Sequence, residues 1–174
     1  GHVEAFFQPQ ICLSTGRLMG FEALARWRHP TLGLLEPSRF LPPLVKSHRT
    51  YDLDMAVLTS GLRAARELRK SGFAIGPVSF HGSCQTLRAP DFVETLQSAM
   101  ATFETSPADV KYEVLETVLI EEERDVALNT LARLKSIGIG VELDDFGGGH
   151  SSLSLLGLFP FDGVKVDRSI VSRI

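Results

Sequence analysis

Acidic residues recur within, or at the end of, short apolar segments of this chain. They lie in the segments 18–27, 110–116 and 141–145 as Glu22, Glu113, Glu116, Asp144 and Asp145. If these segments are parallel β-strands, their carboxylates meet at one edge of the sheet, where functional groups gather. Each acid taken alone is explained equally well as a helix cap or as half of an ion pair. Crowded together, the acids would repel one another, and a divalent cation in an oxygen-rich site, Mg²⁺ or Mn²⁺, removes that conflict.

The strongest local signal is the segment 143–152, Leu-Asp-Asp-Phe-Gly-Gly-Gly-His-Ser-Ser. Two adjacent acids at a strand end point in different directions, so Asp144 and Asp145 could each reach a different metal ion. The three glycines allow a sharp turn and a close approach of the backbone to a ligand. Their spacing is not the G-x-G-x-x-G of dinucleotide-binding loops. A glycine-rich turn that binds nothing is the alternative interpretation.

Short apolar runs alternate with helical patterns, which predicts an α/β fold with parallel strands and helical crossovers. We expect six strands, at 5–13, 18–27, 78–81, 110–116, 141–145 and 163–167, and helices at 37–45, 51–70, 91–103, 124–137 and 151–158. The turn Ser14-Thr15-Gly16 should join the first two strands as a hairpin. The candidates are an open doubly wound sheet and a (β/α)₈ barrel. A barrel normally takes about 250 residues, so six strands in 174 residues fall short of closure.

The last predicted strand carries both a cation and an acid. Because side chains alternate with a period of two, Lys165 and Asp167 share one face of this strand, and Val164 and Val166 share the other. We expect the valines to face the helices and the polar pair to face a barrel interior or a cleft. Lys165 should point into the same mouth as three of the acids, Glu22, Glu113 and Asp144.

The composition is that of an ordinary globular protein and excludes several classes. Lys and Arg total 18 and Asp and Glu total 21, so the net charge of −3 disfavours binding of DNA or RNA polymers. No apolar run reaches the roughly 18 residues of a membrane-spanning helix, and no signal peptide is visible. The two cysteines, Cys12 and Cys84, form no disulfide framework, which favours a reduced intracellular compartment. We therefore expect a single cytoplasmic domain over residues 1–174.

The run 20–30, Gly-Phe-Glu-Ala-Leu-Ala-Arg-Trp-Arg-His-Pro, resembles the signature of the EAL domain of bacterial cyclic di-GMP phosphodiesterases. Further matching motifs follow in the order of that family: Gln8-Pro9, Pro37, Phe40-Leu41-Pro42, the Asp-Asp-Phe-Gly loop with Leu153, and Val-Lys-Val-Asp-Arg-Ser at 164–169. The tripeptide Glu22-Ala23-Leu24 alone would carry little weight, but the whole run and the order of the motifs are specific. The resemblance extends from Phe6 to Val171.

This resemblance implies a TIM-like barrel whose first strand runs antiparallel to the others. It also implies hydrolysis of one phosphodiester bond of the second messenger cyclic di-GMP, which gives linear pGpG. In this scheme two Mg²⁺ or Mn²⁺ ions, about 3.5–4 Å apart, activate a water and stabilise the charge that develops on the phosphate.

The resemblance also assigns roles to single positions of this chain. The family's metal-binding carboxylates match Glu22, Glu113, Asp144 and Asp145, and Lys165 matches the lysine that holds the attacking water. Catalysis would therefore depend on Glu22, Asp144 and Lys165. The family's ligand contacts fall on four further positions, Gln8, Leu24, Arg26 and Asp167, of which Arg26 matches the arginine on the phosphate. Glu116 matches an acid that anchors the glycine-rich loop.

The chain departs from the family pattern in several places. The family's Asn-x-Ser metal motif is His81-Gly82-Ser83 here, so His81 stands in place of an Asn ligand unless it is an ordinary structural histidine. Imidazole suits Mn²⁺ better than Mg²⁺, so we expect Mn²⁺ to be favoured. The usual Thr and Tyr of the loop are Gly148 and His150, and a usual Glu is Val45. The sequence ends at Ile174, before the last two strands with the family's later metal-binding Glu and its final Gln.

Two functions are compatible with these residues. The retained acids and Lys165 favour a phosphodiesterase, of which the 174-residue chain alone would be weak or inactive. His81, Gly148 and the absent strands favour a degenerate domain that binds cyclic di-GMP or a protein partner without hydrolysis. An open barrel exposes apolar edges, so we expect the isolated chain to be marginally stable or to associate, for instance as a homodimer. An attached sensor or diguanylate cyclase domain in a larger protein is also compatible with this sequence.

Overall fold

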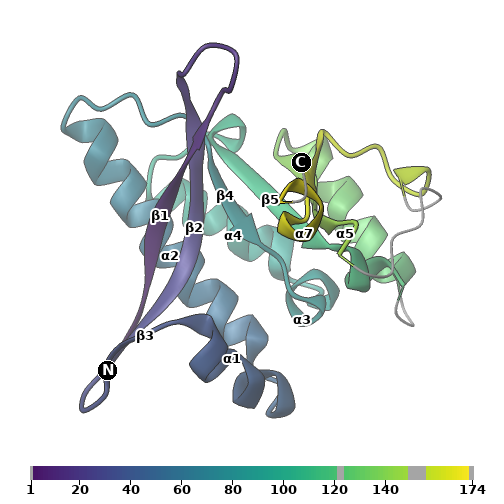
Figure 1. Cartoon of the computed structure of the whole chain (residues 1–174), viewed down its shortest axis with the longest axis horizontal. Coiled ribbons are helices and arrows are strands. Elements are labelled where there is room, and N and C mark those ends of the chain that lie inside the picture. The colour runs from purple at the N-terminus through teal and green to yellow at the C-terminus, as the bar shows by residue number, and fades with distance from the viewer. Residues whose placement is uncertain (1, 121–123, 149–155, 173–174) are drawn as a thin grey trace.

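The structure, a computed structural model, describes residues 2–120, 124–148 and 156–172 of the chain. Its strands form one seven-stranded sheet in the order β1-β2-β4-β5-β6-β7, and β3 pairs with the end of β2 (Figure 1). The strands are β1 (His2–Ile11), β2 (Leu18–His29), β3 (Gly33–Leu35), β4 (Val78–His81), β5 (Val110–Leu115), β6 (Gly140–Phe146) and β7 (Gly163–Val166). The sequence pattern predicts six of these strands and misses the three-residue β3.

The N-terminal hairpin forms as the sequence pattern predicts. Strands β1 and β2 are antiparallel, with Gln8 opposite Glu22. At the turn, the Gly16 N–H donates to the Cys12 carbonyl oxygen over 2.8 Å, and Gly16 has a φ of 67°, which glycine adopts without strain. From β2 through β4, β5 and β6 to β7, neighbouring strands are parallel. The expected mostly parallel sheet with an antiparallel first strand is therefore confirmed.

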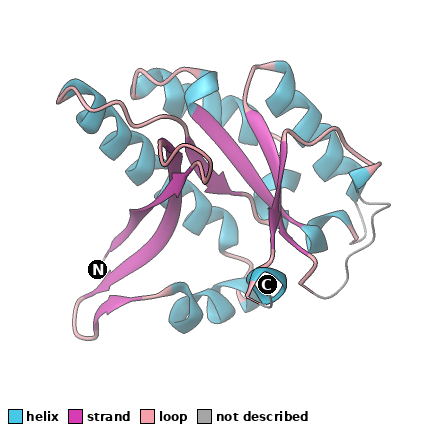
Figure 2. Ribbon diagram, turned by 45° about the horizontal axis from the view of Figure 1, so that its top comes forward, coloured by secondary structure: helices cyan, strands magenta, loops and turns pink. Residues whose placement is uncertain are grey.

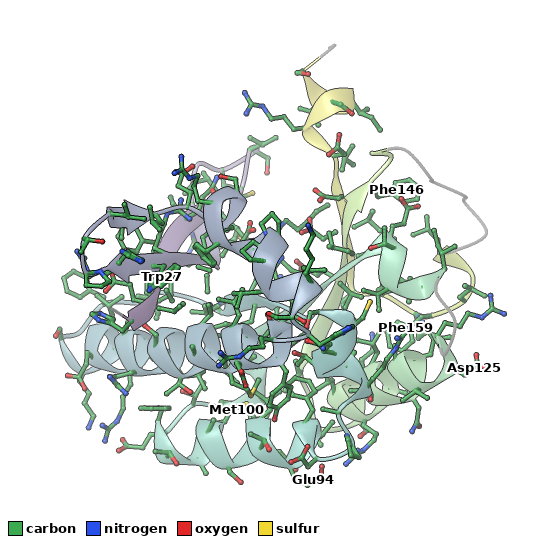
Figure 3. The ribbon with its side chains drawn as sticks, turned by 90° about the horizontal axis from the view of Figure 1, so that it is seen from below. Trp27, Glu94, Met100, Asp125, Phe146 and Phe159 are labelled. Atoms are coloured by element: carbon green, nitrogen blue, oxygen red, sulfur yellow. The ribbon has the colours of Figure 1, made fainter. Side chains whose placement is uncertain are left out.

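The helices (Figure 2) are α1 (Pro37–Lys46), α2 (Thr50–Lys70), α3 (Cys84–Arg88), α4 (Phe92–Thr102), α5 (Arg124–Ser136) and α7 (Arg168–Val171), with 3₁₀ turns η1 (Pro107–Asp109) and η2 (Glu116–Leu119). Helices α2, α4 and α5 lie together on one side of the sheet, and α7 follows β7 away from them (Figure 3). Helix α2 packs against β1, β2 and β4, and α5 packs against β6. Buried Met100 of α4 lies between α4 and α2 (Figure 3). Among the described residues, no helix is both long and apolar enough to cross a membrane.

Alternation along the strands separates an apolar face of the sheet from a polar one. Phe80 and Tyr112 are fully buried toward the helices, and the Tyr112 ring meets the Phe92 ring of α4 edge to face at 5.3 Å. The next residues along the same strands, His81 and Glu113, project from the opposite face, as the period of two requires. Apolar burial against the helices therefore fixes which face of the sheet carries the polar groups.

The open sheet has two edge strands, β1 and β7. The period of two predicts that Val164 and Val166 face the helices, but these valines are 41% and 50% exposed. Helix α5 packs on β6, and β7 contacts chiefly β6, so the valines lack the apolar cover that the prediction assumes. In α7, Ile170 and Val171 are also exposed. The predicted helix over 151–158 falls mostly outside the described residues.

Candidate metal and active site

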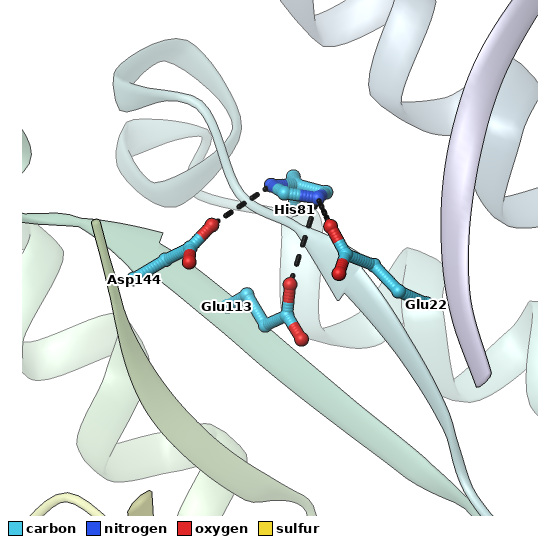
Figure 4. Close-up of side chains that lie close together, drawn as sticks. All are labelled: Glu22, His81, Glu113 and Asp144. Atoms are coloured by element: carbon cyan, nitrogen blue, oxygen red, sulfur yellow. Dashed lines mark hydrogen bonds and ion pairs between the residues drawn. The ribbon is translucent and has the colours of Figure 1, made fainter. Parts of the chain in front are cut away.

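Four strands each bring one potential metal ligand to the same place (Figure 4). The ligands come from β2, β4, β5 and β6 in turn and are Glu22, His81, Glu113 and Asp144. Each offers one ligand atom, and these atoms all lie within 4.8 Å of one another. The parallel register places His81 directly beside Glu113. Glu113 and Asp144 are buried, whereas Glu22 and His81 keep some access to solvent.

The His81 imidazole lies among the three carboxylates. Its Nε2 is 2.9 Å from Glu22 Oε1 and 3.5 Å from Glu113 Oε2. Its Nδ1 is 3.6 Å from Asp144 Oδ2. Burial lowers the pKa of His81, but the hydrogen bond to Glu22 and the charges of the carboxylates outweigh burial and raise it above its ordinary value. A metal ion at this imidazole would therefore compete with a proton up to a higher pH than it would at an ordinary histidine.

Lys165 of β7 extends its ammonium group into the same cluster. Its Nζ donates to Glu113 Oε2 over 2.7 Å and to Glu22 Oε2 over 2.9 Å, and it lies 3.3 Å from Asp144 Oδ1. One lysine faces three carboxylates, so with a neutral His81 the cluster carries two uncompensated negative charges. A divalent cation would balance them.

The ionisable groups of the cluster shift one another's pKa values in opposite directions. The hydrogen bond from His81 outweighs burial and, together with Lys165, lowers the pKa of Glu22 to about 2. Burial raises the pKa of Glu113, although Lys165 and His81 oppose this. Burial lowers the pKa of Lys165, but its hydrogen bonds to Glu113 and Glu22 and the charges of Glu113 and Asp144 together outweigh burial, so the net shift is upward. Such divergence between neighbouring carboxyl groups is what their crowding predicts.

Asp145, expected as a metal ligand, lies outside the four-ligand cluster. It has a φ of 55°, its side chain is exposed, and its N–H donates to Asp144 Oδ1 over 2.9 Å. Partial loss of water around the carboxyl group, with the charges of Asp144 and Asp167, raises the pKa of Asp145. Two residues on, Gly147 has a φ of 97°, which residues other than glycine adopt only with strain, and a Cβ there would also meet the end of the Ile170 side chain of α7. Gly149, His150 and Leu153 lie outside the described residues.

The residues expected to contact a ligand are spread around the cluster. Gln8 is exposed opposite Glu22, and Leu24 is half-buried. The Arg26 guanidinium donates to the Ala25 carbonyl oxygen over 2.9 Å and lies 3.7 Å from Glu36 Oε1. Because side chains alternate along a strand, Arg26 lies on the same face of β2 as Glu22.

Asp167 and Glu116 each follow directly after a strand, Asp167 after β7 and Glu116 after β5. Asp167 caps α7 by accepting the Ser169 N–H over 2.8 Å, and this bond lowers the pKa of its carboxyl group. A Cβ on Gly148 would lie 3.4 Å from Asp167 Cγ, so the cap stands beside the glycine loop. Glu116 is buried at the start of η2, directly after β5.

Sequence reasoning missed Gln10, which contacts the cluster. Its Nε2 donates to Glu113 Oε1 over 3.3 Å. Gln10 shares a face of β1 with Gln8 because side chains alternate, so the period of two could have identified it.

A cavity of about 270 Å³ opens beside the cluster, between β2, β4, α1 and α2. Strands β2 and β4 pair only through Phe21 and Glu22, and the cavity lies where they separate. Its walls are mostly apolar and include Leu24, while His81 and Asp54 line its polar part. Sequence reasoning missed Asp54 of α2. Burial raises the pKa of its carboxyl group.

Comparison with known sequences identifies one family over the whole chain. Residues 1–174 match the EAL domain. The cyclic di-GMP phosphodiesterase RocR of Pseudomonas aeruginosa is 36% identical over 174 residues, which are all of this chain and 44% of RocR. The chain thus spans less than half the length of this relative.

Solved structures agree with this match. The c-di-GMP complex of the phosphodiesterase PaMucR superimposes with a TM-score of 0.88 at 29% identity, over 99% of this chain and 69% of that one. The manganese and cyclic di-GMP complex of BlrP1 from Klebsiella pneumoniae has a TM-score of 0.82 at 27% identity, over 99% of this chain and 42% of that one. EAL domains have a TIM-barrel fold, so the open sheet described above corresponds to part of such a barrel.

Proposed function

Because the chain belongs to the EAL domain family, we propose that it is part of a metal-dependent phosphodiesterase that hydrolyses cyclic di-GMP to linear pGpG. The observation that carries the proposal is the convergence of Glu22, His81, Glu113 and Asp144 around the Lys165 ammonium. RocR acts on cyclic di-GMP, and PaMucR binds it in its solved complex. A cytoplasmic location is part of the same proposal, because the substrate is an intracellular second messenger.

The donor set fits a divalent ion. Ligands about 2.1 Å from a Mg²⁺ ion lie at most about 4.2 Å apart, so atoms now within 4.8 Å need only a small inward movement. The excess negative charge of the cluster matches an ion of charge two. We propose Glu22, His81, Glu113 and Asp144 as its ligands, with Mn²⁺ favoured because imidazole is a softer donor than a carboxamide oxygen. Asp145, next to Asp144, is proposed as a ligand of a second ion.

The chain's own residues would divide the remaining work. Bound ions supply polarisation of the phosphate and a lowered pKa for the attacking water. Lys165 would hold that water and offset the charge that develops, since its ammonium already reaches three carboxylates. Arg26 would orient the phosphate with its planar donors. Gln8, Leu24 and Asp167 would contact the rest of the ligand, and the apolar cavity beside Leu24 is roomy enough for part of a nucleotide. Glu116 would anchor the glycine loop.

A second candidate is a degenerate domain that binds cyclic di-GMP or a protein partner without hydrolysis. The observations that favour it are His81 at the position of an Asn ligand and Asp145 outside the cluster. Both features would weaken binding of two metal ions, and neither would remove the contacts to cyclic di-GMP.

Release of pGpG by the full protein that contains this chain tests the proposal, with Mn²⁺, with Mg²⁺ and with a chelator. Glu22→Gln should abolish turnover, because it removes a charged ligand at the centre of the cluster. Glu142→Gln is the matched control: it breaks the Lys111–Glu142 ion pair on the same sheet, outside the four ligands, and should leave turnover intact. Ligand binding without turnover in the unaltered protein would favour the receptor, and neither binding nor turnover would overturn both.

A further inference from the structure

Helices α2 and α3 cap each other's N-termini through their side chains. Gln85 Oε1 of α3 accepts from Thr50 N over 2.8 Å and from Thr50 Oγ1 over 2.6 Å at the start of α2. In return, Asp54 Oδ2 of α2 accepts from Ser83 N over 2.9 Å and from Thr86 Oγ1 over 2.6 Å at the start of α3. We call these five residues the α2–α3 clasp.

Each helix depends on the other for this cap. Arg49 precedes α2 and makes no side-chain cap of its own, so Gln85 provides the acceptor that the first N–H groups need. Helix α3 has five residues, too few to be stable alone, and its own Ser83 cap is long at 3.3 Å. Asp54 therefore helps to fix the start of α3 and the loop that leads into it, in addition to the packing of α3 against α4 and α5.

That loop begins at His81. Gly82 N donates to the Glu113 carbonyl oxygen over 2.9 Å, which holds the loop on the β5 side. On the β2 side the pairing ends at Glu22 and Ser79, before His81 is reached. On this side the bond from Ser83 N to Asp54 Oδ2, two residues beyond His81, ties the backbone of the loop to α2. A Cβ on Gly82 would lie 3.1 Å from the Tyr112 ring, so the loop packs closely on the sheet at this point.

We propose that Asp54, supported by Gln85, is a positioning residue. It holds the His81 imidazole beside Glu22, in the position from which the imidazole would bind the metal ion. The inference rests on the proposed metal site. If Asp54 loses its acceptor oxygen, the Ser83 N–H and the Thr86 hydroxyl lose their partner on α2, and the Gln85–Thr50 half of the clasp alone remains. The 2.9 Å contact of His81 with Glu22 should then loosen.

The first test needs no metal. In ¹⁵N-histidine-labelled full protein at fixed pH, the His81 ring signals are identified by their loss in His81→Ala. Asp54→Ala should shift or broaden them much more than Asp54→Asn does, because the amide oxygen of Asn can accept both bonds and only the charge near His81 is lost. Asp52→Ala, which breaks the exposed Arg49–Asp52 pair on the same helix, is the matched control and should leave the ring signals unchanged. Unaltered His81 signals in Asp54→Ala would overturn the inference even if the protein binds no metal.

The second test measures Mn²⁺ affinity. Residues that orient metal ligands typically contribute about 10–100-fold in affinity, so Asp54→Ala should weaken Mn²⁺ binding at least about tenfold, with rescue by Asp54→Asn. In a double-mutant cycle the loss should nearly vanish once His81 is Ala, because Asp54 acts through His81. If the losses of Mn²⁺ affinity in Asp54→Ala and His81→Ala simply add in the double variant, the inference about Asp54 is wrong, although the proposed metal site is not affected. If Asp54→Ala does not fold, Gln85→Ala takes its place in both tests, with the same expected results.

Discussion

The Lys165 ammonium donates to Glu113 Oε2 across 2.7 Å, although 52 residues separate them in sequence. Strand β6 lies between their strands, so this bond crosses the polar face of the sheet. Burial and the charge of Glu22 raise the pKa of Glu113, and Lys165 opposes that shift. The Lys165 ammonium therefore already lies among the carboxylates that we propose as metal ligands.

Replacing Lys165 with Met should separate its catalytic contribution from metal binding. The substitution keeps most of the side-chain volume but removes the charge, and loss of one preorganised electrostatic group typically costs about 10²–10³-fold in turnover. Mn²⁺ should bind at least as tightly as before, because the three carboxylates lose their competing partner. Rates of pGpG release and Mn²⁺ titration measure the two effects. Turnover within a few-fold of the unaltered protein would remove Lys165 from the proposed mechanism.

The metal preference should depend on His81. With imidazole in the ligand set, hydrolysis of cyclic di-GMP should be faster with Mn²⁺ than with Mg²⁺, because Mg²⁺ prefers oxygen ligands. His81→Asn supplies a carboxamide oxygen and should move the preference back toward Mg²⁺. The measurement is the ratio of the two rates in both proteins. Equal rates that stay equal in His81→Asn would show that His81 is not a ligand.

Binding of Mn²⁺ should weaken as the pH falls. The neighbouring carboxylates raise the pKa of His81, so its imidazole holds a proton at a higher pH than the ordinary value of about 6.5. Only the neutral ring binds metal, so affinity should be full well above the raised pKa and fall as pH drops through it. Mn²⁺ titrations from pH 6 to 9 test this, with His81→Asn as the control that should flatten the profile. An equally steep profile in that variant would assign the proton to another group.

Much of the fold follows from sequence pattern, and the exceptions have physical causes. The hairpin, the long helix α2 and strand β4 follow from turn residues and periodicity. Strand β3 and helix α3 are three and five residues long, too short for either period to show. The convergence of the acids follows from parallel topology, but the position of Asp145 outside the four-ligand cluster depends on the positive φ of this residue. The clasp joins positions about 30 residues apart through single oxygens, and no local pattern predicts it.

The isolated 174-residue chain should associate or melt at low temperature because of its β7 edge. Val164 and Val166 are 41% and 50% exposed, and an edge strand with apolar side chains is a template for pairing with another chain. Val166→Lys should reduce association, because a lysine on an edge strand opposes pairing. Val126→Lys on α5, where the valine is 47% exposed and away from this edge, is the matched control and should change little. Light scattering and thermal melting of the three proteins, beside a longer segment of the parent protein, measure the effect. A stable monomer of the unaltered 174-residue chain would contradict the expectation, and equal effects of both lysines would locate the association elsewhere.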